Sequence, residues 1–191
     1  MSEQIKEKET LEALTKTFEK VNGIVQRDKR VIVETDAEII PGVLLYAKER
    51  LKFTHFSHMS CVDWIENNQF ELVYILWSPE DKIQLIIKCV INREKPIIQN
   101  IDNIWRQANT YEREIREMFG VEFEGLIGAK EFILEDWDDI PPMRKDFDTK
   151  EYSSKHFFDR PGREDAKDVR TVITERSGEE IPDFAKKYSR D

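Results

Sequence analysis

The sequence indicates an α+β protein: helices cover a mixed sheet with an antiparallel meander, and a long extended C-terminal arm follows. Three consecutive segments between residues 56 and 91 have the apolar character of strands, and three other segments repeat apolar residues at helical spacing. Beyond residue 125 this periodicity fades, and prolines and glycines interrupt the chain. We therefore expect an α+β core domain in residues 1–125 and an extended arm in residues 126–191.

The first expected elements are a helix, a short strand and a second helix. Apolar residues recur on one helical face over residues 10–22, and Gly23 is suited to end that helix. Residues 31–33 form a short apolar run typical of a strand. Pro41 favours the first turn of a helix that continues to Leu51, because its missing N–H has no helical partner there.

The meander is expected next, with strands over residues 56–65, 70–77 and 83–91. Apolar and other residues alternate in the second of these strands, as a half-buried strand requires. Residues 78–82 contain serine, proline and aspartate, which favour a turn between the second and third strands.

A third helix is expected from Asp102, which can cap it, to Phe119. Gly120 follows as a fitting helix stop, and Val121 is placed for the apolar contact that accompanies such a stop.

Composition excludes several functional classes. The chain of 191 residues has a net charge of −9, which gives nucleic-acid binding no electrostatic support. Charged residues make up 36% of the chain, an excess that suits a thermophile, where ion-pair networks are favoured. No apolar run is long enough to span a membrane and the N-terminus does not have the pattern of a signal peptide, so a cytoplasmic location is expected.

Cysteine spacing and glycine motifs argue against a cofactor in this chain. Cys61 and Cys89 are isolated, whereas an iron–sulfur cluster normally needs four thiolates. The chain has neither a G-x-G-x-x-G sequence nor a phosphate loop, so nucleotide binding has no support. If the protein takes part in electron transfer, we expect the redox centres in its neighbours.

Two segments, residues 111–120 and residues 141–147, carry the most distinctive motifs. Together, in this order and at this distance, they resemble the 30 kDa subunit family of respiratory complex I. The motif residues are Glu112-Arg113-Glu114, Glu117, Phe119-Gly120, Phe123, Gly125, Asp136-Trp137 and Arg144-Lys145-Asp146-Phe147. The resemblance spans roughly residues 10–158.

The pattern departs from the family in two places. Leu126-Ile127 stands where the family usually has His-Pro, and Pro142-Met143 stands where many complex I members have His-Pro-Leu. These departures favour a divergent branch, such as the one found in archaeal membrane-bound nickel–iron hydrogenases or sulfur reductases, over a standard NADH enzyme.

The resemblance implies a structural subunit without cofactors, in the hydrophilic arm of an ion-translocating membrane oxidoreductase. Its expected partners are a hydrogenase-large-subunit-like (49 kDa-type) subunit and the iron–sulfur subunits, which would hold the clusters and any nickel–iron site. The expected location is peripheral, on the cytoplasmic side of the cell membrane, with membrane association only through the complex.

We expect the motif residues and nearby aromatic residues to form the subunit interface. Arg113 and Arg144 offer forked donors for carboxylates of a neighbour, and Glu112 and Glu114 can bind its arginines. The alternative is that these charges pair within the domain, as Glu112 with Arg116 and Arg113 with Glu117 at helical i,i+4 spacing. The complete candidate interface is Glu112, Arg113, Glu114, Glu117, Phe119, Gly120, Trp137, Arg144, Lys145, Asp146, Phe147, Phe157 and Phe158.

Two other functions remain open. A stand-alone hydrolase or metal enzyme could use a histidine and the acidic cluster Glu135, Asp136, Asp138 and Asp139. His55 and His58 are poor ligand candidates, because an offset of three on a strand places them on opposite faces. A soluble adaptor outside any membrane complex is the third hypothesis.

Overall fold

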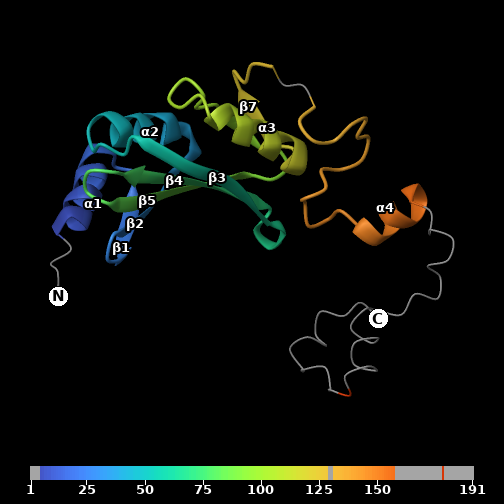
Figure 1. Cartoon of the computed structure of the whole chain (residues 1–191), viewed down its shortest axis with the longest axis horizontal. Helices are drawn as coiled ribbons and strands as arrows, with labels where there is room; N and C mark the ends of the chain where they lie inside the picture. Colours follow the sequence, from blue (N-terminus) through green and yellow to red (C-terminus); the bar gives the residue numbers. More distant parts are fainter. Residues whose placement is uncertain (1–4, 129–130, 158–177, 179–191) are drawn as a thin grey trace. The chain divides into compact units, whose positions relative to one another are not determined.

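The computed structural model describes residues 5–128, 131–157 and 178, which fall into two compact units that divide between Asp148 and Thr149. The first unit contains a five-stranded sheet with the strand order β1-β2-β5-β4-β3 (Figure 1). Its strands are β1 (Asn22–Arg27), β2 (Arg30–Asp36), β3 (His55–Trp64), β4 (Gln69–Ser78) and β5 (Ile83–Asn92).

The sheet is mixed, as the sequence predicts. Strands β3, β4 and β5 follow one another as an antiparallel meander, which confirms the expected arrangement. Strand β2 pairs with β5 in parallel and with β1 in antiparallel orientation. The central strand β5 therefore pairs on one side with β4, its neighbour in sequence, and on the other with β2, which lies far away in the chain.

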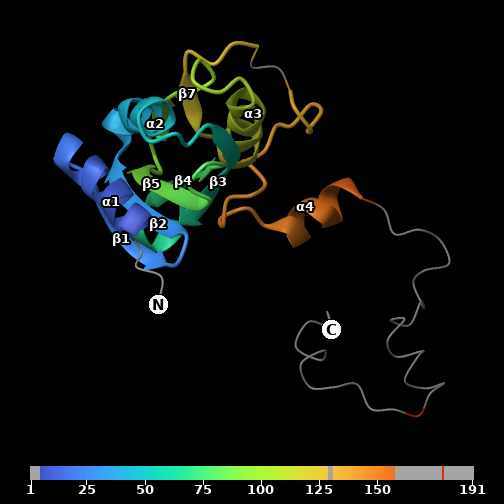
Figure 2. The same ribbon diagram turned by 60° about the vertical axis from the view of Figure 1, so that its left-hand side comes forward.

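Three helices pack on the sheet: α1 (Ile5–Thr17), α2 (Ile40–Glu49) and α3 (Ala108–Phe119). Figures 1 and 2 show α2 and α3 on the same side of the sheet. Short 3-10 helices, η1 (Ala37–Ile39) and η2 (Ile65–Asn67), precede α2 and follow β3. No helix in the described ranges is long and apolar enough to span a bilayer.

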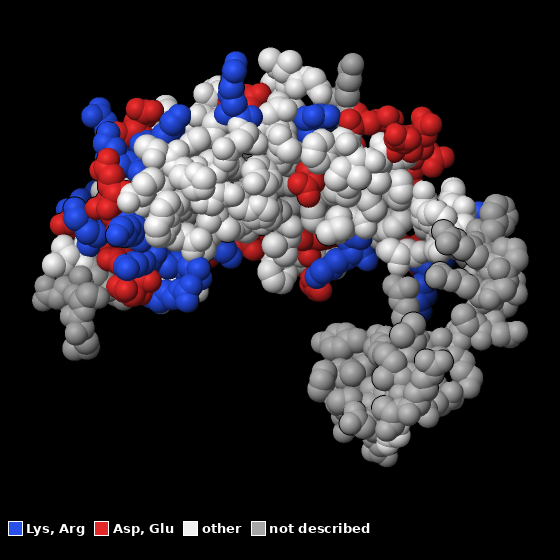
Figure 3. Space-filling view, viewed as in Figure 1, with Lys and Arg blue, Asp and Glu red and all other residues white. Residues whose placement is uncertain are grey.

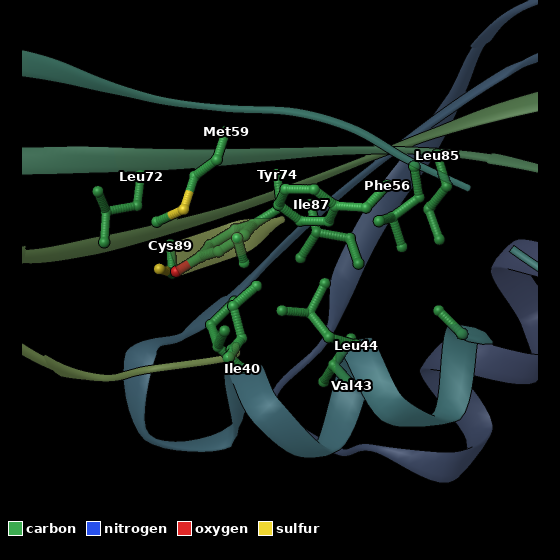
Figure 4. Packing of buried hydrophobic residues seen from close by; sticks show 14 of the residues in the cluster. Ile40, Val43, Leu44, Phe56, Met59, Leu72, Tyr74, Leu85, Ile87 and Cys89 are labelled. Atoms are coloured by element: carbon green, nitrogen blue, oxygen red, sulfur yellow. The ribbon is translucent and has the colours of Figure 1, made fainter. Parts of the chain in front are cut away.

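The core lies between these helices and one face of the sheet. In β4 every second residue is buried (Phe70, Leu72, Tyr74 and Leu76), as the alternation in the sequence predicts. Figure 4 shows Ile40, Val43 and Leu44 of α2 facing residues of the meander, including Tyr74 and Ile87.

The N-terminal elements differ from the expectation. The first helix ends at Thr17, and residues 22–27 form strand β1 instead of the helix end. The physical reason is the absence of a side chain at Gly23. A Cβ there would lie 2.4 Å from the carbonyl oxygen of Ile32 and 3.0 Å from Leu11 Cδ1, so glycine allows β1 to lie close beneath α1.

The third helix begins at Ala108, six residues after the expected cap at Asp102. The side chain of Asp102 instead accepts hydrogen bonds from the side-chain amides of Asn100 (3.1 Å) and Asn109 (3.4 Å). Three short elements were not expected from the sequence: the parallel pair β6 (Ile97–Gln99) and β7 (Glu122–Glu124), and, in the second unit, α4 (Thr149–His156).

The first compact unit continues past the expected domain boundary at residue 125, because residues 126–148 belong to it. The expected arm thus begins with a stretch that contacts the core domain. The docking of the rest of residues 126–191 on partner subunits stays a prediction.

Gly23→Ala should lower the free energy of unfolding by about 1–3 kcal/mol, since the added methyl group meets backbone that cannot move away. Gly42→Ala in α2 is the matched control, because its Cβ would find only Phe18 Cε1 at 3.8 Å. The control should be neutral or stabilising by about 0.5–1 kcal/mol. Urea unfolding of both variants measures the difference, and equal stability would contradict the close packing at β1.

Candidate functional site

The two distinctive sequence segments come together at the C-terminal end of α3. There the helix contacts residues 131–148, which we call the anchored segment. Gly120 ends the helix in the left-handed conformation (φ 79°), and its N–H donates to the carbonyl of Arg116 at 2.9 Å. A Cβ at Gly120 would lie 3.1 Å from Cγ of Pro141, and the N–H of Met143 donates to the carbonyl of Met118 at 3.0 Å. The helix stop predicted at Gly120 is therefore confirmed.

Glu117 holds the beginning of the anchored segment. Its carboxylate accepts three backbone N–H bonds, from Phe132 (2.6 Å), Ile133 (2.7 Å) and Leu134 (2.9 Å). Burial alone would raise the pKa of Glu117, but these three bonds hold it below its ordinary value. A carboxylate with three backbone donors fixes the path of a loop that has no regular secondary structure of its own.

Arg113, one helical turn before Glu117, contacts the same stretch. Its Nη2 donates to the carbonyl of Glu131 at 3.0 Å, and its guanidinium lies 5.0 Å from the ring centre of Phe132. The i,i+4 spacing of Arg113 and Glu117 thus places both side chains against residues 131–134. These contacts lie within the chain, and the expected interface role of Arg113 and Glu117 stays a prediction.

A second anchor joins the anchored segment to the ends of β3 and β5. Asp63 and Arg93 form a buried two-pronged ion pair, with Nε–Oδ1 at 2.8 Å and Nη2–Oδ2 at 3.1 Å. Arg93 Nη2 also binds Asp146 Oδ1 at 2.7 Å, and the N–H of Lys145 donates to Asp63 Oδ2 at 2.8 Å. Arg93 therefore links the sheet to the second motif segment, residues 141–147.

These contacts shift the acidity of both carboxyl groups. Burial alone would raise the pKa of Asp63, but hydrogen bonds from Arg93 and from the N–H of Lys145 hold it below its ordinary value. The hydrogen bond from Arg93 is the main cause that lowers the pKa of Asp146. Both groups therefore stay ionised near neutral pH, and each charge is compensated.

Arg144 and Lys145 complete the second anchor. Arg144 Nε lies 3.3 Å from Asp146 Oδ1, and its guanidinium lies 5.7 Å from the ring centre of Phe70, which Arg93 also approaches at 5.6 Å. Lys145 Nζ lies 5.7 Å from the ring centre of Trp64. These side chains contact their own domain, so any contact with a partner is made by the atoms that remain accessible.

Glu112 requires a correction, because its side chain is fully buried and does not present a surface for partner arginines. Its Oε1 accepts the N–H of Ile101 at 2.7 Å, and no described residue donates a hydrogen bond to Oε2. Burial raises the pKa of Glu112 to about 7. The expected i,i+4 pair of Glu112 with Arg116 is absent for the same reason, and Arg116 lies 3.7 Å from Glu122 instead.

The other candidate interface residues differ in exposure and in the residues that they contact. Glu114 is exposed on α3, and Phe119 packs edge-on against Phe70. Trp137 and Phe147 pack together within the anchored segment, with ring centres 5.5 Å apart. Phe157 is exposed in the second unit, and Phe158 lies outside the described residues.

Sequence reasoning missed Asp63 and Arg93, which hold the second anchor. Asp63 lies near the end of β3 and Arg93 directly follows β5, and 29 residues of chain separate them, so the strand register brings them together. The available signal was weak, because β3 and β5 also contain other polar side chains, such as His58 and Lys88.

The acidic cluster of the alternative metal-enzyme hypothesis lies in the anchored segment, where Figure 3 shows acidic side chains gathered at the upper right. Within the described ranges no three His, Cys, Asp or Glu side chains come together as metal ligands. One correction concerns the histidines. A bulge between Phe56 and His58 places His55 opposite Trp77 and His58 opposite Ile75, hence on one face of the sheet.

A cavity of about 280 Å³ lies between α3 and the anchored segment. It is lined by charges of both signs and by apolar groups: Arg113, Arg116, Glu117, Glu122, Glu131, Leu134 and Trp137. Arg113 and Glu117, which belong to the helix motif, already hold the loop. In this chain these two residues therefore have a structural role: they hold a loop against the end of a helix.

Asp63→Asn should lower the free energy of unfolding by about 3 kcal/mol at pH 7, because Arg93 loses its buried counter-charge. Since folding lowers the pKa of Asp63, its contribution is complete above the ordinary value of 3.8 and is lost as the pH falls below it. Denaturant unfolding at pH 7 and pH 3 measures both effects. Asp36→Asn, in an exposed pair with Lys20, is the control, and an equal loss in both variants would disprove the anchor.

Glu112→Gln should raise the melting temperature at pH 8 and change it little at pH 5. Folding raises the pKa of Glu112 from 4.5 to about 7, so the folded protein loses stability as the pH rises through this range. Glutamine imitates the protonated acid and can still accept the N–H of Ile101. The expected gain at pH 8 is about 2 kcal/mol, and a gain of the same size at pH 5 would show that charge is not the cause.

Comparison with known proteins gives the family of this chain. The profile described as "Respiratory-chain NADH dehydrogenase, 30 Kd subunit" matches residues 33–153. The C/D 2 subunit of the NADH-quinone oxidoreductase of Aquifex aeolicus is 35% identical over 115 residues, which are 60% of this chain and 19% of that protein. The C subunit of the F(420)H(2) dehydrogenase of Methanosarcina mazei is 28% identical over 145 residues, which are 72% of this chain and 89% of that protein.

Two solved structures share the fold. A chain of the membrane-bound sulfane sulfur reductase, an archaeal respiratory membrane complex, superposes with a TM-score of 0.68 at 29% identity, covering 85% of this chain and 98% of that chain. The trypsin-resistant fragment of Nqo5 superposes with a TM-score of 0.55 at 21% identity, covering 63% of this chain and 96% of that fragment. With residues 33–153 matched, the chain belongs to the 30 kDa subunit family of the respiratory-chain NADH dehydrogenase.

Proposed function

We propose that this protein is a scaffold subunit, without a redox cofactor of its own, in the hydrophilic arm of a complex I-related membrane oxidoreductase. Its partners are a hydrogenase-large-subunit-like subunit and iron–sulfur subunits, which carry the electrons. It is peripheral and lies on the cytoplasmic side. The observation that carries this proposal is the likeness to a chain of the archaeal sulfane sulfur reductase, which extends over 98% of that chain.

The anchored segment gives the proposal a physical basis. Glu117 and Arg113 hold one end of this segment, and Arg93 and Asp63 hold the other. A loop fixed at both ends loses little conformational entropy when a partner binds it. The kind of partner that the anchored segment can bind then depends on the side chains that it exposes to solvent.

Large apolar side chains are among those exposed on the anchored segment. Ile133 is 61% exposed and Met143 is 58% exposed, and Ile140 is also exposed. Apolar groups held in water by a fixed backbone are typical of a surface that another protein covers. Among the candidate interface residues, Glu114 and Lys145 are also exposed.

The proposal is tested by purifying the affinity-tagged subunit from native membranes in mild detergent. We expect the large subunit and the iron–sulfur subunits to co-purify, with activity in the complex that reduces protons, sulfur compounds or a quinone. The chain produced alone should be colourless and free of stoichiometric iron and flavin. Recovery of the tagged protein only from the soluble fraction, or tightly bound iron in the chain alone, would contradict the proposal.

Variants locate the contact within the same experiment. Ile133→Asp combined with Met143→Asp should lower recovery of the large subunit by at least about tenfold, because charges replace buried apolar contacts. Leu45→Asp is the control, since Leu45 is 49% exposed on α2, away from the anchored segment in sequence. The melting temperature of each isolated variant separates lost binding from lost folding.

A further inference from the structure

The five-stranded sheet has a second face, opposite the helices, with an ordered apolar pattern. Strand pairing aligns Ile24 with Ile32, Ile32 with Ile86, and Ile86 with Ile75. These four side chains, one from each of β1, β2, β5 and β4, form what we call the isoleucine row. Since residues of adjacent strands that pair directly point to the same face, the row crosses four strands on one side of the sheet.

The isoleucine row is much more exposed than the face that packs on the helices. Ile24 on the edge strand is 60% exposed. Ile32, Ile75 and Ile86 are half-buried, whereas the strand neighbours of these three residues on the helix side are buried. Figures 1 and 2 show α2 and α3 on the other side of the sheet. Neither of these two helices therefore covers the isoleucine row.

A basic cavity adjoins the isoleucine row. It has a volume of about 530 Å³ and is lined by Arg27, Asp28, Lys29, Arg30, Trp77 and Gln84. Arg30, Gln84 and Trp77 pair across β2, β5 and β4, two residues along each strand from the row. The cavity and the row are consequently neighbouring parts of one face.

The charge of the cavity is opposite to that of the whole protein. Three cationic side chains line it against one carboxylate, Asp28, in a chain with a net charge of −9. Figure 3 shows basic side chains, together with acidic ones, over the end of the sheet where β1 and β2 meet. Arg30 Nε is buried, and no described residue accepts a hydrogen bond from it. A carboxylate in the cavity would supply that acceptor.

We infer that the isoleucine row and the basic cavity form a docking surface for an acidic, apolar segment of a neighbouring subunit. Aliphatic side chains of that segment lie on the row, and its carboxylates lie at Arg27, Lys29 and Arg30. A second copy of this chain would bring an identical basic cavity instead of the complementary charge. Nucleic acid would leave the isoleucine row uncovered. The inference rests on the proposed function, since the segment belongs to the same complex.

Zero-length coupling with a carbodiimide tests the chemistry of the occupant. In the purified native complex, Lys29 should couple to an aspartate or glutamate of another subunit, and peptide mass spectrometry identifies the pair. Coupling of Lys29 only to carboxylates of its own chain, only to a second copy, or to none would overturn the inference.

Two sets of variants test the surface in the tagged subunit purified from membranes. Arg27→Glu combined with Lys29→Glu, and separately Ile24→Asp, should each lower recovery of the complex by at least about tenfold, as loss of a desolvated contact does. Lys8→Glu combined with Lys16→Glu makes the same charge change on α1, and Leu45→Asp makes the same apolar-to-charged change on α2. Both controls should retain the complex.

The outcomes separate this inference from the proposed function. If wild type and controls recover the complex while the face variants do not, the inference stands, provided that the isolated variants melt like wild type. If the face variants also recover it, the inference fails and the proposed function stands. If wild type recovers no partner, the proposed function fails and the inference with it.

Discussion

The ion pair between Asp63 and Arg93 joins the ends of β3 and β5 and, through Asp146, holds the second family motif against the sheet. A buried arginine needs all its charge compensated, and two carboxylates and a phenylalanine ring surround this one. The hydrogen bonds from Arg93 stabilise the ionised form of Asp63 and of Asp146, and the pKa values of both are therefore lowered. Without the pair, residues 144–147 would lose their main point of attachment to the sheet.

Glu117 attaches the other end of the anchored segment to the domain, by hydrogen bonds to backbone instead of an ion pair. Here one carboxylate replaces the hydrogen-bond partners that a strand or helix would give to three consecutive backbone N–H groups. In this chain the two anchors bring the helix end and the distant charged loop together, because α3 and residues 141–147 meet in the folded protein.

Periodicity in the sequence was sufficient for the meander, for α2 and for the helix stop at Gly120, because each depends on local pattern and burial. It was insufficient for β1, whose residues 22–27 form a strand through a close approach at Gly23 that no local pattern reveals. The site was predictable only in part. Arg113, Glu117 and Asp146 were recognised from their motif, but their contacts Glu131, Phe132 and Arg93 depend on tertiary structure.

The parallel pairing of β2 with β5 has a consequence for how the chain acquires its fold. The two strands are neighbours in the sheet, yet residues 37–82 lie between them in the chain. During synthesis the β1–β2 hairpin emerges early, but its inner edge has no partner until β5 has left the ribosome. We expect the meander to form first, because it closes short loops, whereas the hairpin joins the sheet across a long loop. The N-terminal hairpin should then be the last large part of the sheet to pair, although it is the first to be synthesised.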